Sequence, residues 1–272
     1  MMLEPTNDNR MMFAYEALHW QIEHLSEGFN KECGKGHFET NLDALASNSG
    51  LYRFVAPVLR SWRMYHFHDT GESALVKQRQ GLNDNDYLRP DARNLAAYLY
   101  LLQRVFPEIY MRIVQHIQLV APFFGDFMLR PAPDSADQIE LEWKEKGCDV
   151  PFKASMLSDG TLRFICLAAA LIQPEETRPA TIIIDEPELG LHPYAINVLG
   201  AMLKAASHDT QVIISTQSTE LLGNFEPSDI IVADRTNNGT ELRRLDNAEL
   251  EDWIEDYSLR ELWLKNILGG QP

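Results

Sequence analysis

The chain has 272 residues, of which 45% are hydrophobic and 24% are charged. This allows one large globular domain or two small ones with a substantial core. The formal net charge of −16 excludes a chain-wide electrostatic footprint for nucleic acid, so any DNA contact needs a local basic patch or another subunit.

The three cysteines, Cys33, Cys148 and Cys166, do not have the spacing of metal ligands. We therefore expect neither structural disulfides nor a zinc site, and a cytoplasmic protein fits this cysteine usage best. No apolar run approaches the ~20 residues that a membrane span requires, so we expect no membrane segment.

The N-terminal part has helical periodicity. Apolar residues recur at alternating spacings of four and three from Met11 to Phe29, which predicts one helix packed on the body of the domain. The glycines from Gly28 to Gly36 resemble a phosphate loop only in part, because no hydroxyl follows Lys35 and a helical pattern precedes them. We predict a surface turn there.

Two histidines and an acid follow in the segment Tyr65–Thr70. On a strand, His66 and His68 would share a face, with Phe67 on the opposite face. One interpretation is a metal site made of these histidines and Asp69. A polar face beside a buried aromatic is the commoner arrangement, and a role beside a nucleotide stays open.

A charged, loop-rich stretch at 75–93 precedes two helical patterns, Asp91–Phe106 and Pro107–Val120. Pro107 suits the first position of a helix. Together with the predicted N-terminal helix, these patterns predict a mainly helical lobe over residues 1–136.

From Asp137 onward the pattern changes to strands, and we assign residues 137–272 to a second, α/β part. Alternation predicts a hairpin with strands at 139–143 and 150–154. Further downstream we predict a helix at 193–206. A strand pair at 229–233 and 241–245, joined at Asn237–Gly239, and a final helix at 246–254 complete this part.

The segment Leu157–Arg163 begins an apolar helix. Ser158 and Asp159 are good N-cap types, and Gly160 leaves the backbone bare. The helix would therefore present free N–H groups and the positive end of its dipole to an anion. Plain capping without a ligand is the alternative.

The segment Thr181–Asp185 predicts a buried parallel strand that ends in two acids. Open α/β sheets bind their ligands at this end of their strands. Asp185 could hold Mg²⁺ through its water shell, and Glu186 could orient or deprotonate a water molecule. An acidic turn without chemistry is the alternative. The segment Gln211–Ser218 predicts another buried strand that ends in polar side chains.

In this order and at these spacings, the three segments resemble the signature motif, Walker B and switch region of ATP-binding-cassette (ABC) ATPases. Asp185–Pro193 is similar to the Asp-Glu-Pro-Glu-x-Gly-Leu-His-Pro pattern of RecF, structural-maintenance-of-chromosomes (SMC) and OLD-like AAA family ATPases. The resemblance covers residues 156–235. It implies an α/β fold, namely the C-terminal part of an ABC-ATPase-type P-loop NTPase head with an incomplete sheet and a helical lobe.

The resemblance also implies an ATPase that uses Mg²⁺ and works as a homodimer with ATP between signature and D-loop surfaces. Gln217 stands where a histidine is common in this fold, and His192 has plain helix capping as an alternative role. The implied site residues are Glu186 and Gln217 for catalysis, Asp185 for Mg²⁺, and Ser158, Asp159, Gly160, Gly190 and His192 for nucleotide contacts.

No stretch offers a Walker A loop, which in the family precedes all of these motifs. Either the sequence lacks the N-terminal part of its domain or the protein is a degenerate ATPase. We favour the first explanation, so we expect the chain to be inactive alone and a Walker A loop to lie within ~150 codons upstream. The alternative is a partner or regulatory subunit that hydrolyses nothing. Both DNA repair and phage defence, with DNA or a DNA-processing protein as partner, are implied by the resemblance.

Overall fold

The computed structural model describes residues 2–8, 10–20, 29–42, 52–236, 239–246, 250, 253 and 257–270. The chain divides into two compact units, Met1–Trp62 and Arg63–Pro272. Each unit is described by itself below. The domain boundary expected between residues 136 and 137 stays a prediction.

The first unit is built on an antiparallel sheet in the order β1-β2-β3. Its elements are β1 (Met2–Pro5), β2 (Met11–Trp20), β3 (Phe29–Gly34) and α2 (Tyr52–Arg60). Leu59 of α2 packs with Leu18, Cys33 and Leu42 in a small apolar cluster. These contacts give the unit a core of its own.

The helix predicted from Met11 is wrong for residues 11–20, which form β2; residues 21–28 lie outside the described residues. Apolar residues at spacings of four and three fall on both faces of a strand, so this period could not reveal that β2 pairs with β1 and β3. The predicted turn is wrong for 29–34, which form β3. Gly34 at the end of β3 and Gly36 beyond it have φ of +125° and +75°, as a turn at the strand end requires.

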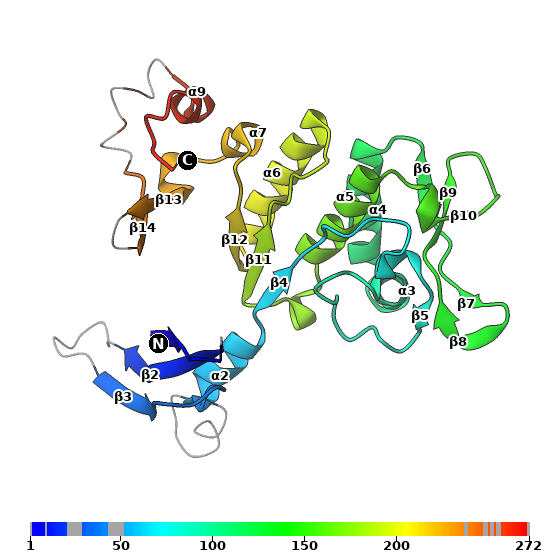
Figure 1. Ribbon diagram of the computed structural model, residues 1–272. Coiled ribbons are helices and arrows are strands. Elements are labelled where there is room, and N and C mark those ends of the chain that lie inside the picture. Colours follow the sequence, from blue (N-terminus) through cyan, green and yellow to red (C-terminus); the bar gives the residue numbers. More distant parts are fainter. Residues whose placement is uncertain are drawn as a thin grey trace. The chain divides into compact units, whose positions relative to one another are not determined.

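The second unit is organised around a parallel sheet in the order β12-β11-β4 (Figure 1). The strands are β4 (Arg63–Tyr65), β11 (Thr181–Asp185) and β12 (Gln211–Ser215). Ile182 and Ile184 of β11 are buried, which confirms the central buried strand. Strand β12 differs from the prediction because Ile213 is 47% exposed. Among the described strands, β12 pairs only with β11, so it is an edge strand.

Helices pack beside this sheet and carry most of the core. They are α3 (Leu95–Val105), α4 (Pro107–Val120), α5 (Asp159–Leu171) and α6 (Pro193–Ser207), with the short α7 (Thr219–Leu222) beyond β12. The predicted α3, α4 and α6 are confirmed to within a few residues at each end, and Pro107 begins α4. The helices share one large apolar cluster that extends from Tyr65 to Leu221.

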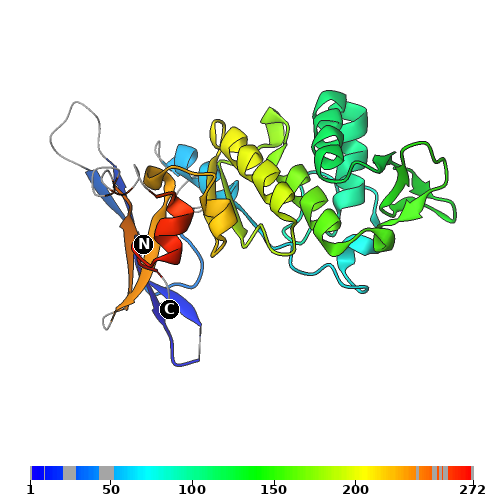
Figure 2. The same ribbon diagram turned by 90° about the horizontal axis from the view of Figure 1, so that it is seen from above.

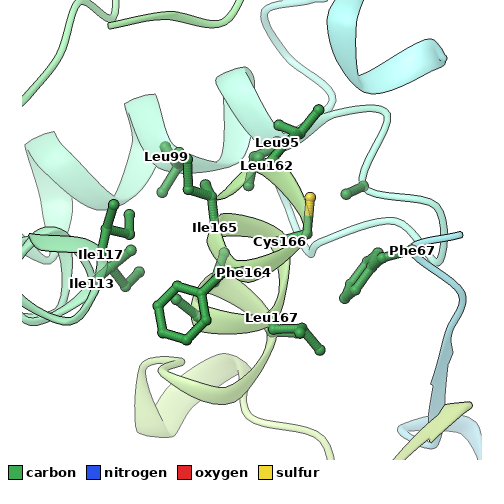
Figure 3. Packing of buried hydrophobic residues seen from close by; sticks show 14 of the residues in the cluster. Phe67, Leu95, Leu99, Ile113, Ile117, Leu162, Phe164, Ile165, Cys166 and Leu167 are labelled. Carbon is green, nitrogen blue, oxygen red and sulfur yellow. The ribbon is translucent and has the colours of Figure 1, made fainter. Parts of the chain in front are cut away.

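Helix α5 lies in the middle of that cluster. Figure 3 shows its Leu162 and Ile165 against Leu95 and Leu99 of α3 and near Ile113 of α4. Every residue from Leu162 to Leu171 is buried. The helix is therefore fixed along its length, and only its N-terminal turn reaches the surface.

Two small antiparallel sheets lie beyond the helices, in the orders β5-β8-β7 and β10-β9-β6. The hairpin predicted before α5 is present, because Phe152 pairs with Trp143. Its predicted first strand at 139–143 is divided, since residues 140–141 separate the end of one strand from the start of the next. The strands are β5 (Gln80–Gly81), β6 (Phe124–Phe127), β7 (Pro131–Ala132), β8 (Ser135–Ile139), β9 (Glu142–Glu145) and β10 (Phe152–Lys153).

The C-terminal hairpin pairs β13 (Ile231–Thr236) with β14 (Gly239–Arg244), as predicted, although the bounds differ by one to three residues. Helix α9 (Leu259–Leu264) lies beside it in Figure 2, and Leu262 shares a small core with Val232. Most of the predicted helix at 246–254 lies outside the described residues. No helix within the described ranges is long and apolar enough to cross a membrane.

Candidate functional site

The ends of three strands meet at one edge of the parallel sheet. Ile184 stands beside Tyr65 of β4, and Asp185 stands beside Ser215 of β12. Because the strands are parallel, the residues that follow them, His66 and Glu186 among them, emerge at the same carboxyl edge. The sequence placed two of these strand ends at a common site, and the structure adds β4 as the third.

Asp185 is exposed at this edge, and its carboxylate is fixed by a neighbour. Ser215 donates a hydrogen bond from Oγ to Oδ1 of Asp185. The main-chain oxygen of Asp185 lies 3.1 Å from Nε2 of His68. One carboxylate oxygen is therefore held in place while the other remains open to solvent or a ligand.

Glu186 has a backbone conformation that is rare for a residue with a side chain, with φ of +41°. Its N–H donates to the Ser215 carbonyl at 2.9 Å, which continues the sheet by one residue before the chain turns away at Pro187. Local strain of this kind persists only where surrounding contacts impose it, and it is concentrated at functional sites. The side chain is half-buried.

Glu188 is a further acid at this edge that the sequence reasoning did not single out. Its Oε1 accepts a hydrogen bond from Oγ1 of Thr216 at 2.5 Å, while its Oε2 is buried without a hydrogen-bond partner. A buried carboxylate oxygen without a donor is costly. The sequence signal that could have singled out Glu188 was the recurrence of polar side chains just after β11 and just after β12.

The N-terminus of α5 is exposed and capped as predicted. Ser158 accepts from the Thr161 N–H at 3.1 Å, and both Ser158 and Asp159 are exposed. Lys77 lies 3.5 Å from the Asp159 carboxylate. Plain capping is thus confirmed, and phosphate binding by this helix end stays a prediction.

Gly160 lies directly against the loop that follows Glu186. A Cβ built on Gly160 would stand 2.5 Å from the Gly190 carbonyl oxygen, which is closer than real Cβ atoms come to such an oxygen. Gly190 itself has φ of +75°. These two glycines therefore allow the first turn of α5 and the loop around Gly190 to meet.

Arg163 joins three segments of the site through hydrogen bonds from its side chain. Its guanidinium donates to the carbonyls of Phe67 at 2.8 Å and His68 at 3.2 Å, and also to that of Leu189. Arg163 is 7% exposed, so it is a buried cation that bonds main-chain oxygens and does not form a surface ion pair. The sequence could not show this, since the carbonyls come from segments far apart in the chain.

The last two predicted site residues lie on the surface. His192 caps α6 by accepting from the Tyr194 N–H at 3.3 Å, so its capping role is confirmed and its D-loop role stays a prediction. Gln217 is exposed two residues beyond β12, and its catalytic role also stays a prediction.

Two titratable groups lie in the core near the site. Burial raises the pKa of the Cys166 thiol on α5 to about 12. Burial likewise raises the pKa of Tyr65 to about 12, against a lowering by its hydrogen bond with Gln173. Both groups are therefore neutral at physiological pH and supply no nucleophile.

The two exposed imidazoles lie beside Asp185. Ligand atoms of His66, His68 and Asp185 all lie within 4.8 Å of one another. The predicted set of His66, His68 and Asp69 is thus wrong in its acid. Asp185 of the neighbouring strand β11 lies beside the histidines in place of Asp69. Phe67 is buried between the two histidines, as the alternation predicted.

Comparisons with known proteins agree on family and fold. Residues 35–223 match the family described as AAA domain, putative AbiEii toxin, Type IV TA system. Over 78 residues the chain is 39% identical to the Old nuclease of Escherichia phage P2, a stretch that covers 28% of this chain and 13% of that protein. The chain therefore matches only a small part of the length of this curated relative.

Among solved structures, the Smc head bound to the C-winged helix domain of ScpA is similar with a TM-score of 0.52 and 14% identity. The similarity covers 91% of this chain and 68% of that one. A Pyrococcus furiosus Smc head with an extended coiled coil has a TM-score of 0.45 and 17% identity. The similarity covers 58% of this chain and 39% of that chain. The first of these supports the predicted α/β fold of an ATPase head.

The family match spans well over half of the chain, and it includes the signature helix, β11 and β12. The three converging strand ends and the exposed acids thus belong to a recognised domain. The chain is therefore a member of the family described as AAA domain, putative AbiEii toxin, Type IV TA system.

Proposed function

We propose that this protein takes part in ATP hydrolysis at the carboxyl edge of the β4, β11 and β12 sheet. The observation that carries the proposal is that Asp185 and Glu186 emerge together at this edge, next to Ser215. A fixed acid beside a second acid in a strained turn suits a reaction that depends on positioning a phosphate and a water molecule.

Asp185 suits a magnesium ion bound through water. Its Oδ1 is occupied by Ser215, and the residue is exposed, so its second oxygen has room for hydrated Mg²⁺. When bound, Mg²⁺ would neutralise charge that develops on the phosphates. Ser215 keeps the Asp185 carboxylate oriented in either state.

Glu186 is the candidate for holding the attacking water. Its main-chain N–H is hydrogen-bonded to the Ser215 carbonyl, so the backbone that carries its carboxylate is held at the sheet edge. A carboxylate at this point can accept a proton from water as bond formation begins. Gln217, which is exposed beyond β12, is our candidate for a hydrogen bond to a phosphate oxygen or to the same water.

The N-terminus of α5 supplies the second surface. Ser158 and Asp159 are exposed at the first turn of α5, and the N–H groups at a helix N-terminus suit the binding of phosphate. We propose that this turn covers the nucleotide of a second copy and that Gly190 and His192 join the same contact. The functional unit is then a homodimer with ATP at its interface.

The biological task that we propose is nucleic-acid processing or defence against phage. It rests on the family and on a relative named Old nuclease from a phage. Because the chain carries a net charge of −16, we expect DNA to be bound through a local patch or a partner protein.

The test is Glu186→Gln in the natural full-length protein. We expect ATP binding to persist and turnover to fall by about 10²-fold or more, because the amide cannot accept the proton. ATP should then hold the variant as a dimer, measured by light scattering on a sizing column.

Glu176→Gln is the matched control, since Glu176 is exposed in the short turn before β11. Its turnover should equal that of the unchanged protein. Equal turnover in Glu186→Gln would remove Glu186 from the mechanism. If the unchanged protein itself binds no ATP, the role of a non-hydrolysing partner subunit is favoured.

A further inference from the structure

The exposed edge of the sheet holds two imidazoles beside the acid that the proposed function assigns to magnesium. His66 and His68 follow β4, and Asp185 ends the adjacent strand β11. Pairing of Tyr65 with Ile184 puts His66 next to Asp185 in the continued register. Strand pairing therefore fixes which acid meets these histidines.

The two rings point to the same side because the residue between them is anchored in the core. Phe67 is 5% exposed and stacks on Tyr65 with ring centroids 5.4 Å apart. In an extended segment the neighbours of a buried residue face outward together. The centroids of the two imidazole rings are accordingly 6.4 Å apart.

The backbone that carries the rings is also fixed. Arg163 donates to the carbonyls of both Phe67 and His68, and Nε2 of His68 lies 3.1 Å from the Asp185 carbonyl oxygen. Ligands held in this way before binding lose little conformational freedom when an ion arrives.

We propose that His66, His68 and Asp185 form a binding site for a divalent transition-metal ion such as Mn²⁺ or Zn²⁺. One ligand atom from each residue lies within 4.8 Å of the others, so small side-chain rotations bring all three to coordination distance. Imidazole nitrogen is a ligand for transition metals, whereas Mg²⁺ takes oxygen ligands. Two imidazoles thus select against Mg²⁺.

The three ligands leave part of the coordination sphere open. All three residues are exposed, so the remaining positions are accessible to water or to a phosphate oxygen. The metal site shares Asp185 with the proposed ATPase site but needs no nucleotide to form. It goes beyond the proposed function by adding a transition-metal ion that the histidines and Asp185 would bind at this edge of the sheet.

The experiment measures metal binding to the untagged chain after removal of metals with a chelator. Binding of Mn²⁺ is measured from the decrease in the electron paramagnetic resonance signal of the free ion. Binding of Zn²⁺ is measured by calorimetry. We expect one ion per chain and no displacement by Mg²⁺ in large excess. His66→Ala and His68→Ala should each weaken binding by more than about tenfold.

His116→Ala is the matched control, because His116 is a half-buried histidine on α4, away from the sheet edge, whose Nδ1 lies 2.7 Å from the Arg112 carbonyl. It should bind the metal as the unchanged chain does. The proposal would be overturned if His66→Ala and His68→Ala bound the metal as tightly as the unchanged chain does. It would also be overturned if Mg²⁺ displaced bound Mn²⁺ or Zn²⁺ at equal concentration.

Asp185→Asn separates this inference from the proposed function. If Asp185→Asn loses Mn²⁺ while both histidine variants keep it, the histidine site is disproved and the magnesium role of Asp185 stands. If the metal site is confirmed while Glu186→Gln keeps full ATP turnover, the proposed hydrolytic mechanism fails and the metal site remains.

Discussion

Arg163 is a buried cation that joins three segments through their main-chain oxygens. Its guanidinium contacts Phe67, His68 and Leu189, so the signature helix, the histidine segment and the loop after Glu186 share one side chain. The local sequence pattern does not show whether such an arginine is buried or exposed. The distinction depends on burial, which follows from the packing of α5 and not from the local pattern.

Arg163→Lys should lower the free energy of unfolding by about 2–4 kcal/mol, because an ammonium cannot replace a planar fork of donors and buried carbonyls are left without partners. Urea unfolding followed by circular dichroism measures the change. Arg79→Lys is the control, since Arg79 pairs with Asp134 at the surface and should cost less than about 1 kcal/mol. Equal losses in both variants would contradict the role assigned to Arg163.

At the scale of elements, the contact between α5 and the loop after β11 positions the two halves of the site. Gly160 approaches the Gly190 carbonyl so closely that a methyl group would overlap it. Helix propensity alone would favour alanine at Gly160. The close approach to the loop outweighs that preference.

Gly160→Ala should therefore destabilise the protein by about 1–3 kcal/mol despite its gain in helix propensity. Gly81→Ala is the control, because nothing lies within 4 Å of a Cβ at Gly81. Thermal unfolding of the two variants checks the difference. A Gly160→Ala protein as stable as the control would show that the loop moves away without cost.

The elements also show where sequence periodicity succeeds and where it fails. Helices α3, α4 and α6 were predictable because each buries a continuous apolar face against one large core. Strand β2 was mistaken for a helix because its partners β1 and β3 determine its conformation. Strand β12 was expected to be buried, but among the described strands it has only β11 beside it.

On the scale of the whole molecule, the core holds one thiol and several phenols in their neutral form. Burial raises the pKa of Cys166 and of Tyr65 to about 12, and it raises the pKa of Tyr98 and Tyr110 as well. In the unfolded chain a thiol titrates near ~8.5 and a phenol near ~10. The unfolded state therefore loses these protons at a lower pH than the folded state does.

Stability should fall as pH rises above about 9, because the unfolded state then releases protons that the folded state keeps. The stabilisation is complete below the unfolded pKa values and is lost as pH approaches the folded value of about 12. Between pH 8 and 11 we expect a loss of about 3 kcal/mol or more, measured by urea unfolding. Cys166→Ala should flatten this dependence, and an unchanged slope would contradict the burial argument.

The sequence by itself determined the α/β class, the principal helices, the buried strand β11 and the pair Asp185 and Glu186 at its end, because these depend on local periodicity and on residue chemistry at strand ends. Only the tertiary structure decided that His66 and His68 meet Asp185, that Arg163 is buried beneath them and that Glu188 contacts Thr216. Those contacts join residues far apart in the chain. Strand pairing and core packing, which no local pattern encodes, bring them together.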